Sequence, residues 1–283
     1  MIKTYFSITK PGILFGNSIT AIGGFALVSK GHLDPWLFLA MLAGLSLIMA
    51  SGCVFNNYID RIADEKMGRT KKRALAQRSI PLKNALIFAV LLGLSGTFIL
   101  ASYTNILTVS IALAGFFVYV VAYSIWKYRT EHATLIGSVA GAVPPVVGYC
   151  AVSNSFDLGA FILFMIVVLW QMPHFFAIAI YRQHEYAAAS IPVLPIKRGI
   201  HVTKVQMVLY LVAFIAAAFA LTLFGYTGYA YLAVAALLGA AWLWFCIKGF
   251  KAQNDKLWAR KMFLSSLVVI ITLSLMISLD AVK

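Results

Sequence analysis

The sequence predicts an all-α integral membrane protein in which about nine transmembrane helices form one bundle. Hydrophobic residues make up 62% of the 283 residues, and charged residues make up only 11%. The mean hydropathy of +0.90 is typical of a membrane protein rather than of a soluble domain. Because the apolar runs are too long and too numerous for a soluble core, we expect one transmembrane domain that covers residues 1–283.

Each expected helix is an apolar run of roughly 20 residues, which is the length that crosses the hydrocarbon core of a bilayer. In chain order, the runs cover residues 12–29, 36–57, 84–102, 105–125, 133–153, 158–180, 205–225, 228–248 and 262–280. The segment before the first run lacks a short apolar core followed by a small-residue cleavage site, so we expect no removable signal peptide. Cys53, Cys150 and Cys246 lie singly in or beside apolar runs, and we expect core residues without a disulfide.

The positive charges alternate along the chain. A net charge of +14 can indicate nucleic-acid binding, but Lys and Arg crowd the N-terminus and the loops after the second, fourth, sixth and eighth runs. Only Lys30 and Lys283 lie in the remaining loops and ends. This positive-inside pattern predicts a cytoplasmic N-terminus and an outer C-terminus in a bacterial-type inner membrane, with no nucleic-acid partner.

Three oxygen-bearing side chains lie at the end of the second run and just beyond it. Asn56, Asp60 and Asp64 follow one another at intervals of four residues, in a chain with only nine carboxylates. Residues four apart share one face of an α-helix, and carboxylate, amide and water oxygens are the ligands that Mg²⁺ prefers. The pattern indicates a magnesium site. The alternative is that both acids solvate a helix end and pair with Arg61 or Lys66.

A strongly basic loop follows these acids. Its Lys and Arg side chains can hold the oxygens of a diphosphate that the metal leaves free. They are Lys66, Arg69, Lys71, Lys72 and Arg73. The acids of the chain avoid the middle of the bilayer, where a transporter or a pump would place them. The charged cytoplasmic end of the apolar bundle, which we call its mouth, suits an amphiphile whose anionic head stays near water, such as a prenyl diphosphate.

The loop between the fourth and fifth runs is the next polar segment. Lys127 and Arg129 are placed to bind a diphosphate or a carboxylate of an acceptor, although the positive-inside rule also accounts for cations there. Gly137 and Gly141 allow close helix contacts, and Pro144 with Pro145 predicts a bend in the fifth run.

The sixth run carries polar groups within the membrane. Gln171 and His174 flank Pro173, which predicts a kink, and Arg182 with Glu185 follows at the expected cytoplasmic end. A single intramembrane His is often a structural hydrogen-bond donor rather than a ligand, and both interpretations stay open for His174.

With these segments in view, the chain resembles the UbiA-type intramembrane prenyltransferase superfamily, and within it the protohaem IX farnesyltransferase (haem O synthase) family. The resemblance runs almost from end to end. It rests on TKPGILFGN, ASGCVFNNYIDRIADEKMGRTKKRAL, YSIWKYRT, GSVAGAVPPVVGY, WQMPHFFAIAIYR, YAAASIPVLP and WARKMF. The NxxxDxxxD pattern marks the superfamily, whereas WQMPHF followed by IPVLP is more specific to the haem-modifying branch.

The resemblance implies a reaction and a set of residue roles. Mg²⁺ held by Asn56, Asp60 and Asp64 would bind farnesyl diphosphate, and Arg69 with Arg73 would hold the diphosphate. Ionisation would give a farnesyl cation, which a vinyl group of haem b attacks before water adds. The haem acceptor comes from the resemblance alone.

Further roles follow from the same resemblance. Many superfamily members carry a second DxxxD motif for another Mg²⁺, but this chain has RQHEY there, so Glu185 is the one carboxylate left for a second metal. His174 is expected on the haem side, as an iron ligand, a propionate partner or a base that orients water. Further candidates for haem or diphosphate contacts are His184, Lys127, Arg129, Arg182, Arg260 and Lys261. Tyr58 and Tyr181 either face the cation or anchor the protein at the membrane surface.

Three alternatives remain from the sequence. The first is a prenyltransferase for an aromatic quinone precursor, and the second is a membrane transporter or haem carrier without catalysis. The third is a structural subunit of an oxidase complex, which leaves the pattern of Asn56, Asp60 and Asp64 unexplained. The preferred reading expects farnesyl diphosphate and haem b as substrates, Mg²⁺ as cofactor, and a haem-copper oxidase or haem A synthase downstream.

Overall fold

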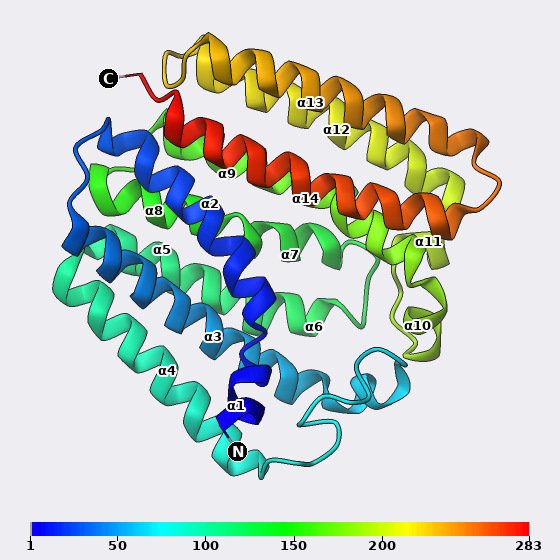
Figure 1. Cartoon of the computed structure of the whole chain (residues 1–283). Helices are drawn as coiled ribbons and strands as arrows, with labels where there is room; N and C mark the ends of the chain where they lie inside the picture. Colours follow the sequence, from blue (N-terminus) through cyan, green and yellow to red (C-terminus); the bar gives the residue numbers. More distant parts are fainter. Residues whose placement is uncertain (1, 283) are drawn as a thin grey trace.

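The computed structural model describes residues 2–282, most of which lie in helices (Figure 1). Within this range nine helical segments are long and apolar enough to span a membrane, as the sequence predicted. The helices are α1 (Ile2–Ile8), α2 (Pro11–Ser29), α3 (Pro35–Lys66), α4 (Leu82–Tyr103), α5 (Ile106–Phe117), η1 (Val118–Tyr123), α6 (Ser124–Trp126), α7 (Ala133–Gly141), α8 (Val143–Ser153), α9 (Leu158–Tyr181), α10 (Gln183–Ala188), α11 (Leu194–Lys197), α12 (Gly199–Leu223), α13 (Tyr229–Lys248), η2 (Gly249–Lys251) and α14 (Asp255–Leu279). The described residues form no strand beyond an isolated bridge between Thr227 and Ala281.

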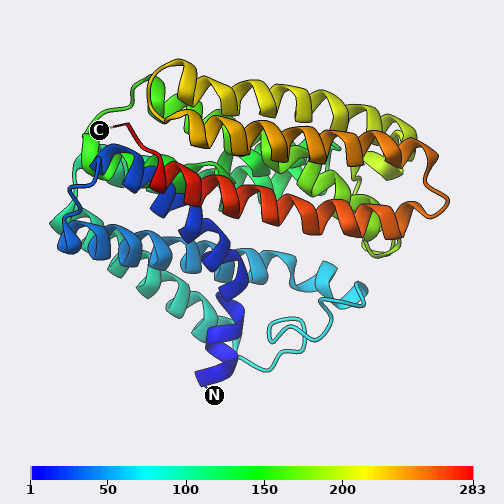
Figure 2. The same cartoon turned by 45° about the horizontal axis from the view of Figure 1, so that its top comes forward.

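Six of these elements form a closed ring. α3 contacts η1, η1 contacts α7, α7 contacts α9, α9 contacts α14, α14 contacts α2, and α2 returns to α3. α4 packs on the outside of α3, while α12 and α13 pack beside α9 and α14. Figure 2 shows α3 and α4 on one side of the molecule and α12 to α14 on the other, with α2 between them. Polar side chains of α3 and α9 can therefore face a shared interior.

α3 is longer than the sequence pattern predicted, and it carries the polar motif. It begins at Pro35, where the carboxylate of Asp34 accepts the N–H groups of Trp36 and Leu37. It continues to Lys66 and so spans about 48 Å at 1.5 Å per residue. Because a hydrocarbon core is about 30 Å thick, the last turns of α3 extend beyond it toward the basic loop.

α12 and α14 also begin earlier than expected, and a polar contact joins their N-terminal parts. Lys204 was expected in a loop, but it lies within α12 and is only 5% exposed. Its Nζ donates to the main-chain oxygen of Gly249 at 2.6 Å and to Oδ1 of Asp255 at 2.5 Å. One lysine thus joins α12, η2 and α14.

Irregular turns interrupt two spans, whereas a third span remains one helix although it contains a proline. The fifth span divides into α7 and α8 at Ala142, just before Pro144 and Pro145, where a bend was predicted. The fourth span contains the π-helical turn η1. α9 continues as one helix through Pro173. The three cysteines are buried and free, as expected.

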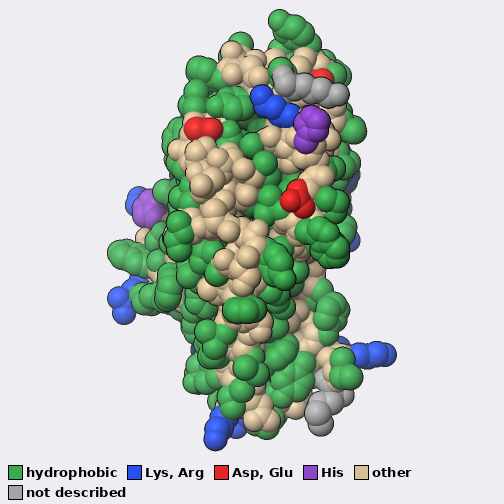
Figure 3. Space-filling view, turned by 90° about the vertical axis from the view of Figure 1, so that its left-hand side faces the viewer, with side chains coloured by type: hydrophobic (Ala, Val, Ile, Leu, Met, Phe, Trp, Pro, Cys, Tyr) green, Lys and Arg blue, Asp and Glu red, His purple; other side chains and the backbone are tan. Residues whose placement is uncertain are grey.

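The two ends of the bundle differ in charge. The end shown in Figure 3 consists largely of hydrophobic and other uncharged groups, with few charged side chains. It carries the connections around residues 30–34, 104–105, 154–157 and 224–228. The loop after α3, α10 and α11 lie at the opposite end, where most Lys and Arg are found. This asymmetry agrees with the alternating charge pattern of the sequence.

Candidate active site

The three motif residues share one buried face of α3. Asn56, Asp60 and Asp64 are 3%, 4% and 1% exposed, so the two acids do not solvate the helix end. Neither acid pairs with Arg61 or Lys66. Arg61 instead donates to the main-chain oxygen of Tyr58 at 2.6 Å. Buried carboxylates are costly unless they are paired, and their partners must come from elsewhere in the chain.

Each motif residue has a basic partner from a different part of the chain. Nζ of Lys10, just before α2, donates to Oδ1 of Asn56 at 2.5 Å. Nζ of Lys127, just after α6, lies 2.5 Å from Oδ2 of Asp60. NH1 of Arg73, in the basic loop, contacts both carboxylate oxygens of Asp64 at 3.0 and 2.8 Å. Three cations thus converge on the oxygens of one helical face.

Two of the groups at this site were not predicted from the sequence. The hydroxyl of Tyr128 donates to Oδ1 of Asp60 at 2.8 Å. Partial burial and the nearby charge of Asp60 raise the pKa of Tyr128, so the hydroxyl stays protonated. Burial lowers the pKa of Lys10 from 10.5 to about 8, so Lys10 is still mainly charged at neutral pH. Their sequence signals are a TKPG segment and a KY pair, which are common at membrane edges.

The donor set fits a divalent cation that is shared with an anionic ligand. Nδ2 of Asn56 is buried and has no hydrogen-bond partner among residues 2–282, so it remains free to donate to a ligand. Within the same residues, no three His, Cys, Asp or Glu side chains converge to form a closed metal cage. Two carboxylates and an amide oxygen, completed by oxygens of a phosphate, are a usual arrangement for Mg²⁺.

Aromatic rings lie beside the acids on the next wall of the ring. The rings of Tyr119 and Tyr123 stack with centroids 5.8 Å apart and an interplanar angle of 8°. Tyr119 packs on Gly52 of α3, where an added Cβ would lie 3.2 Å from the ring. Nζ of Lys127 lies 5.6 Å from the centroid of Tyr123. The π-helical turn η1 carries both tyrosines, and such turns occur frequently at functional sites.

Glu185 joins the basic loop to α10. Its carboxylate pairs with NH1 of Arg182 at 2.6 Å and accepts the N–H of Arg69 at 3.1 Å. Partial burial disfavours its charged form, but these two arginines outweigh that effect and lower the pKa of Glu185. Glu185 therefore stays ionised and holds the loop across the end of the bundle. Its predicted role as a metal ligand stays a prediction.

His174 lies within the bundle, on another wall. It is 8% exposed, and its Nδ1 is 2.7 Å from Oγ of Ser266 in α14. Gln171, on the preceding turn, donates to the main-chain oxygen of Ser138 in α7 at 3.2 Å. Because α7 and α14 are neighbours of α9 in the ring, both side chains lie on the part of α9 that faces the interior.

The remaining predicted residues are not gathered around the motif. Guanidinium groups lie over the rings of Tyr58 and Tyr181, at 4.4 and 4.5 Å from their centroids. Tyr58 is about 200° around α3 from Asn56 at 100° per residue. Arg129 is exposed and makes no ion pair within residues 2–282. His184, Arg260 and Lys261 are also exposed.

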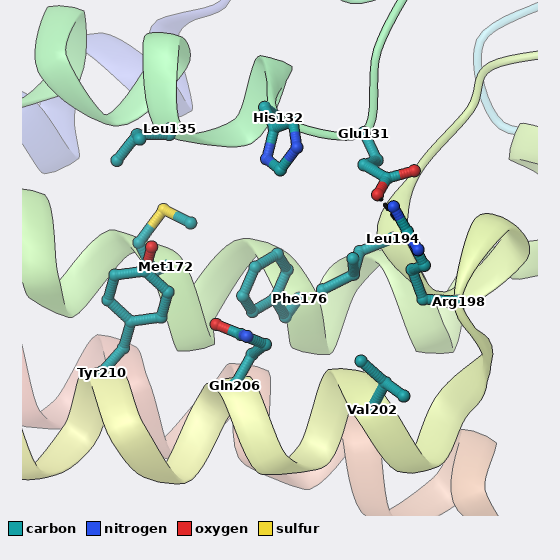
Figure 4. A pocket seen from close by; sticks show the side chains of 10 residues that line it. All are labelled: Glu131, His132, Leu135, Met172, Phe176, Leu194, Arg198, Val202, Gln206 and Tyr210. Carbon is teal, nitrogen blue, oxygen red and sulfur yellow. Dashed lines mark hydrogen bonds and ion pairs between the residues drawn. The ribbon is translucent and has the colours of Figure 1, made fainter.

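A separate pocket of about 360 Å³ lies between the start of α7 and α9, α11 and α12 (Figure 4). Met172 and Phe176 line it from a side of α9 that does not carry His174. The ion pair of Glu131 with Arg198, at 2.7 Å, lies at one end of this pocket. None of the motif residues lines it, so it is distinct from the candidate site.

Replacement of Lys127 by Met is expected to destabilise the protein by roughly 1–3 kcal/mol, because Asp60 loses its cation but keeps Tyr128 as a donor. Thermal unfolding in detergent measures the effect. Arg129→Met is the matched control, since this exposed side chain has no ion pair among the described residues, and it is expected to change stability by less than about 0.5 kcal/mol. Equal stability of the two variants would contradict a structural role for the pair.

Comparisons with known proteins show the family of the chain. A sequence model of the UbiA prenyltransferase family matches residues 17–267. A protein of Sodalis glossinidius (strain morsitans) named protoheme IX farnesyltransferase is 55% identical over 282 residues, covering 99% of this chain and 95% of the relative.

Solved structures have the same fold. A digeranylgeranylglyceryl phosphate synthase aligns with a TM-score of 0.80 at 18% identity, covering 98% of each chain. A UbiA homologue from Archaeoglobus fulgidus bound to DMAPP and Mg²⁺ aligns with a TM-score of 0.71 at 12% identity, covering 97% of this chain and 99% of that one.

Proposed function

Because the chain belongs to the UbiA prenyltransferase family, we propose that it transfers the farnesyl group of farnesyl diphosphate to a vinyl group of haem b, with addition of water. The observation that carries this proposal is the buried face of Asn56, Asp60 and Asp64, on which three cations converge. The relative from Sodalis, which is similar over nearly the whole chain, supports haem as the acceptor.

The side chains at this face have distinct roles in the reaction. When bound at Asn56, Asp60 and Asp64, Mg²⁺ supplies positive charge to the departing diphosphate. Lys10, Lys127 and Arg73 exchange their contacts with the motif for contacts with diphosphate oxygens. The free Nδ2 of Asn56 supplies a further hydrogen bond. Stabilisation of the departing anion lowers the barrier to breaking the allylic C–O bond.

The walls around this face govern the allylic cation. Stacked Tyr119 and Tyr123 offer ring faces beside the acids, and cations are attracted to such faces. Tyr58 and Tyr181 remain further candidates for that role. Arg69 and Arg182 bind the diphosphate or a carboxylate of the acceptor. Glu185 is the carboxylate that would hold a second Mg²⁺. Arg129 binds either anion at the mouth.

The orientation in the membrane follows from the charges. The site opens toward the cytoplasm, at the end of the bundle where Lys and Arg are concentrated, with the N-terminus on the same side and the C-terminus outside. We place the protein in a bacterial inner membrane as one transmembrane prenyltransferase domain over residues 1–283. Its product is consumed by a haem A synthase or a haem-copper oxidase.

A product assay tests this function. Membranes that contain the protein, given farnesyl diphosphate, Mg²⁺ and haem b, are expected to form a haem product that is heavier by the farnesyl group and one water. Chelation of Mg²⁺ by EDTA is expected to stop this reaction, and added Mg²⁺ restores it. Mass spectrometry and diphosphate release provide the measurements.

Two outcomes would contradict the proposal. Prenylation of a hydroxybenzoate without any haem product would indicate an enzyme for quinone precursors. Movement of substrate across the membrane without diphosphate release would indicate a carrier.

A further inference from the structure

His174 and Trp170, one turn apart on α9, both bind the same residue of α14. Nε1 of Trp170 donates to the main-chain oxygen of Ser266 at 2.9 Å, while Nδ1 of His174 lies 2.7 Å from Oγ of Ser266. The imidazole stacks on Trp170 with centroids 4.7 Å apart and packs against Phe263 at 5.1 Å. One hydrogen bond and two aromatic contacts therefore fix the orientation of the imidazole, and the second hydrogen bond holds the ring of Trp170 beside it.

The protons in this cluster have one arrangement that satisfies every contact. Oγ of Ser266 also lies 2.6 Å from the main-chain oxygen of Phe263. A carbonyl oxygen can only accept, so the single hydroxyl proton of Ser266 must lie on that contact. The contact with His174 then needs a proton on Nδ1, which donates to Oγ of Ser266. No carboxylate or other anion contacts the buried imidazole among residues 2–282, so the ring is neutral and Nε2 carries a lone pair.

Nε2 is consequently an acceptor without a partner. No group between residues 2 and 282 donates to it. The rings of Trp170, Phe175 and Phe263 pack against the imidazole. His174 lies seven residues before Tyr181, the last residue of α9, which places it about 10 Å into the bundle at 1.5 Å per residue. Arg182 follows at the mouth.

We propose that Ser266 is a positioning residue that holds His174 in the tautomer with its proton on Nδ1, so that Nε2 binds the iron of the haem acceptor. This inference rests on the proposed function. A hydrogen bond from the other ring nitrogen is the usual way in which proteins orient a metal-binding His and raise its basicity. Neutral His is also a common axial ligand of haem iron.

The same geometry disfavours the other two roles of His174. A propionate carboxylate needs a donor, and Nε2 has no proton to give. A bound water needs two to four polar partners, whereas the rings that pack against the imidazole are aromatic. Iron needs only the lone pair. Carboxylates of the macrocycle can then extend toward Arg182 at the mouth.

Haem binding to the purified protein tests this inference. With ferric haem b, the wild-type protein is expected to give the absorption spectrum of imidazole-ligated haem, and His174→Ala to lose it. Ser266→Ala is expected to weaken haem binding by roughly 10–100-fold, the range for loss of a hydrogen-bond partner of a metal-binding His. Ser265→Ala is the matched control, because Ser265 bonds to the main-chain oxygen of Met262 in the same way but does not contact His174. It is expected to bind haem as the wild type does.

A second variant identifies the ligand even if the alanine variants fold poorly. His174→Cys is expected to replace the imidazole spectrum by that of thiolate-ligated haem, a change that loss of packing cannot produce. A wild-type spectrum in His174→Cys, or unchanged affinity in folded Ser266→Ala, would overturn the inference.

The product assay run in parallel separates this inference from the proposed function. If the wild type forms farnesylated haem but His174→Ala gives the same haem spectrum as the wild type, the proposed function stands and the iron-ligand assignment is wrong. If the haem has the spectrum of an imidazole complex but no product forms, the iron-ligand assignment stands and the proposed function is wrong.

Discussion

Replacement of Asp60 by Asn is expected to lower the rate of prenyl transfer by at least roughly 10²-fold, the loss seen when one electrostatic contact to a transition state is removed. The neutral amide binds Mg²⁺ more weakly than a carboxylate does, so the departing diphosphate is less well stabilised. Asp64→Asn is expected to have an effect of the same order. Product formation at saturating farnesyl diphosphate and haem b, measured over a range of Mg²⁺ concentrations, checks both variants.

The matched control for these variants lies on the same helix. Asp34 caps the first turn of α3 at the other end of the bundle, and Asn is an equally good capping residue. Asp34→Asn is therefore expected to keep wild-type activity and stability. Near-normal turnover in either Asp60→Asn or Asp64→Asn, in a protein that folds like the wild type, would contradict the metal assignment. If the wild type binds the substrates but turns none of them over, the result would instead favour a carrier.

Replacement of Gly148 by Ala is expected to destabilise the protein by about 3 kcal/mol or more, at or above the upper end of the usual range for overpacking. An added Cβ on Gly148 of α8 would overlap the main-chain oxygen of Ala21 in α2, and one on Gly24 would overlap the main-chain oxygen of Pro145. Main-chain atoms of two packed helices cannot move aside as a flexible side chain can. Gly24→Ala is expected to act in the same direction. Thermal unfolding in detergent measures the loss.

Gly16→Ala provides the control for this second prediction. Gly16 is exposed on α2, and nothing lies within 4 Å of an added Cβ. Since Ala has the higher helix propensity, this variant is expected to be as stable as the wild type or up to about 1 kcal/mol more stable. Equal stability of all three variants would show that α2 and α8 do not pack through their glycines.

Much of the fold could be predicted because its signals are local. Nine apolar runs of bilayer length predicted the nine spans, and the structure confirmed them within residues 2–282. The errors lie at helix ends. α3, α12 and α14 extend past the apolar runs, and charged side chains in these added turns find partners elsewhere in the protein, such as Arg73 for Asp64 and Asp255 for Lys204. Hydropathy cannot register those partners.

The candidate site was predictable to the same extent. Asn56, Asp60 and Asp64 share one face of a helix because they are four residues apart, a relation that the sequence contains directly. Their partners are remote. Lys10 is 46 residues from Asn56, Tyr128 is 68 from Asp60, and Ser266 is 92 from His174. No spacing rule connects such pairs.

The sequence by itself determined that this chain spans a membrane many times and gathers an amide and two acids beside a basic loop. Helix periodicity and bilayer thickness act over at most a few tens of residues, so both conclusions need only local sequence. The tertiary structure alone decided which cations meet the acids, and that the hydroxyl of Ser266 sets the tautomer of His174. These contacts depend on how distant helices pack, because burial excludes water and leaves each polar group to find its partner within the protein.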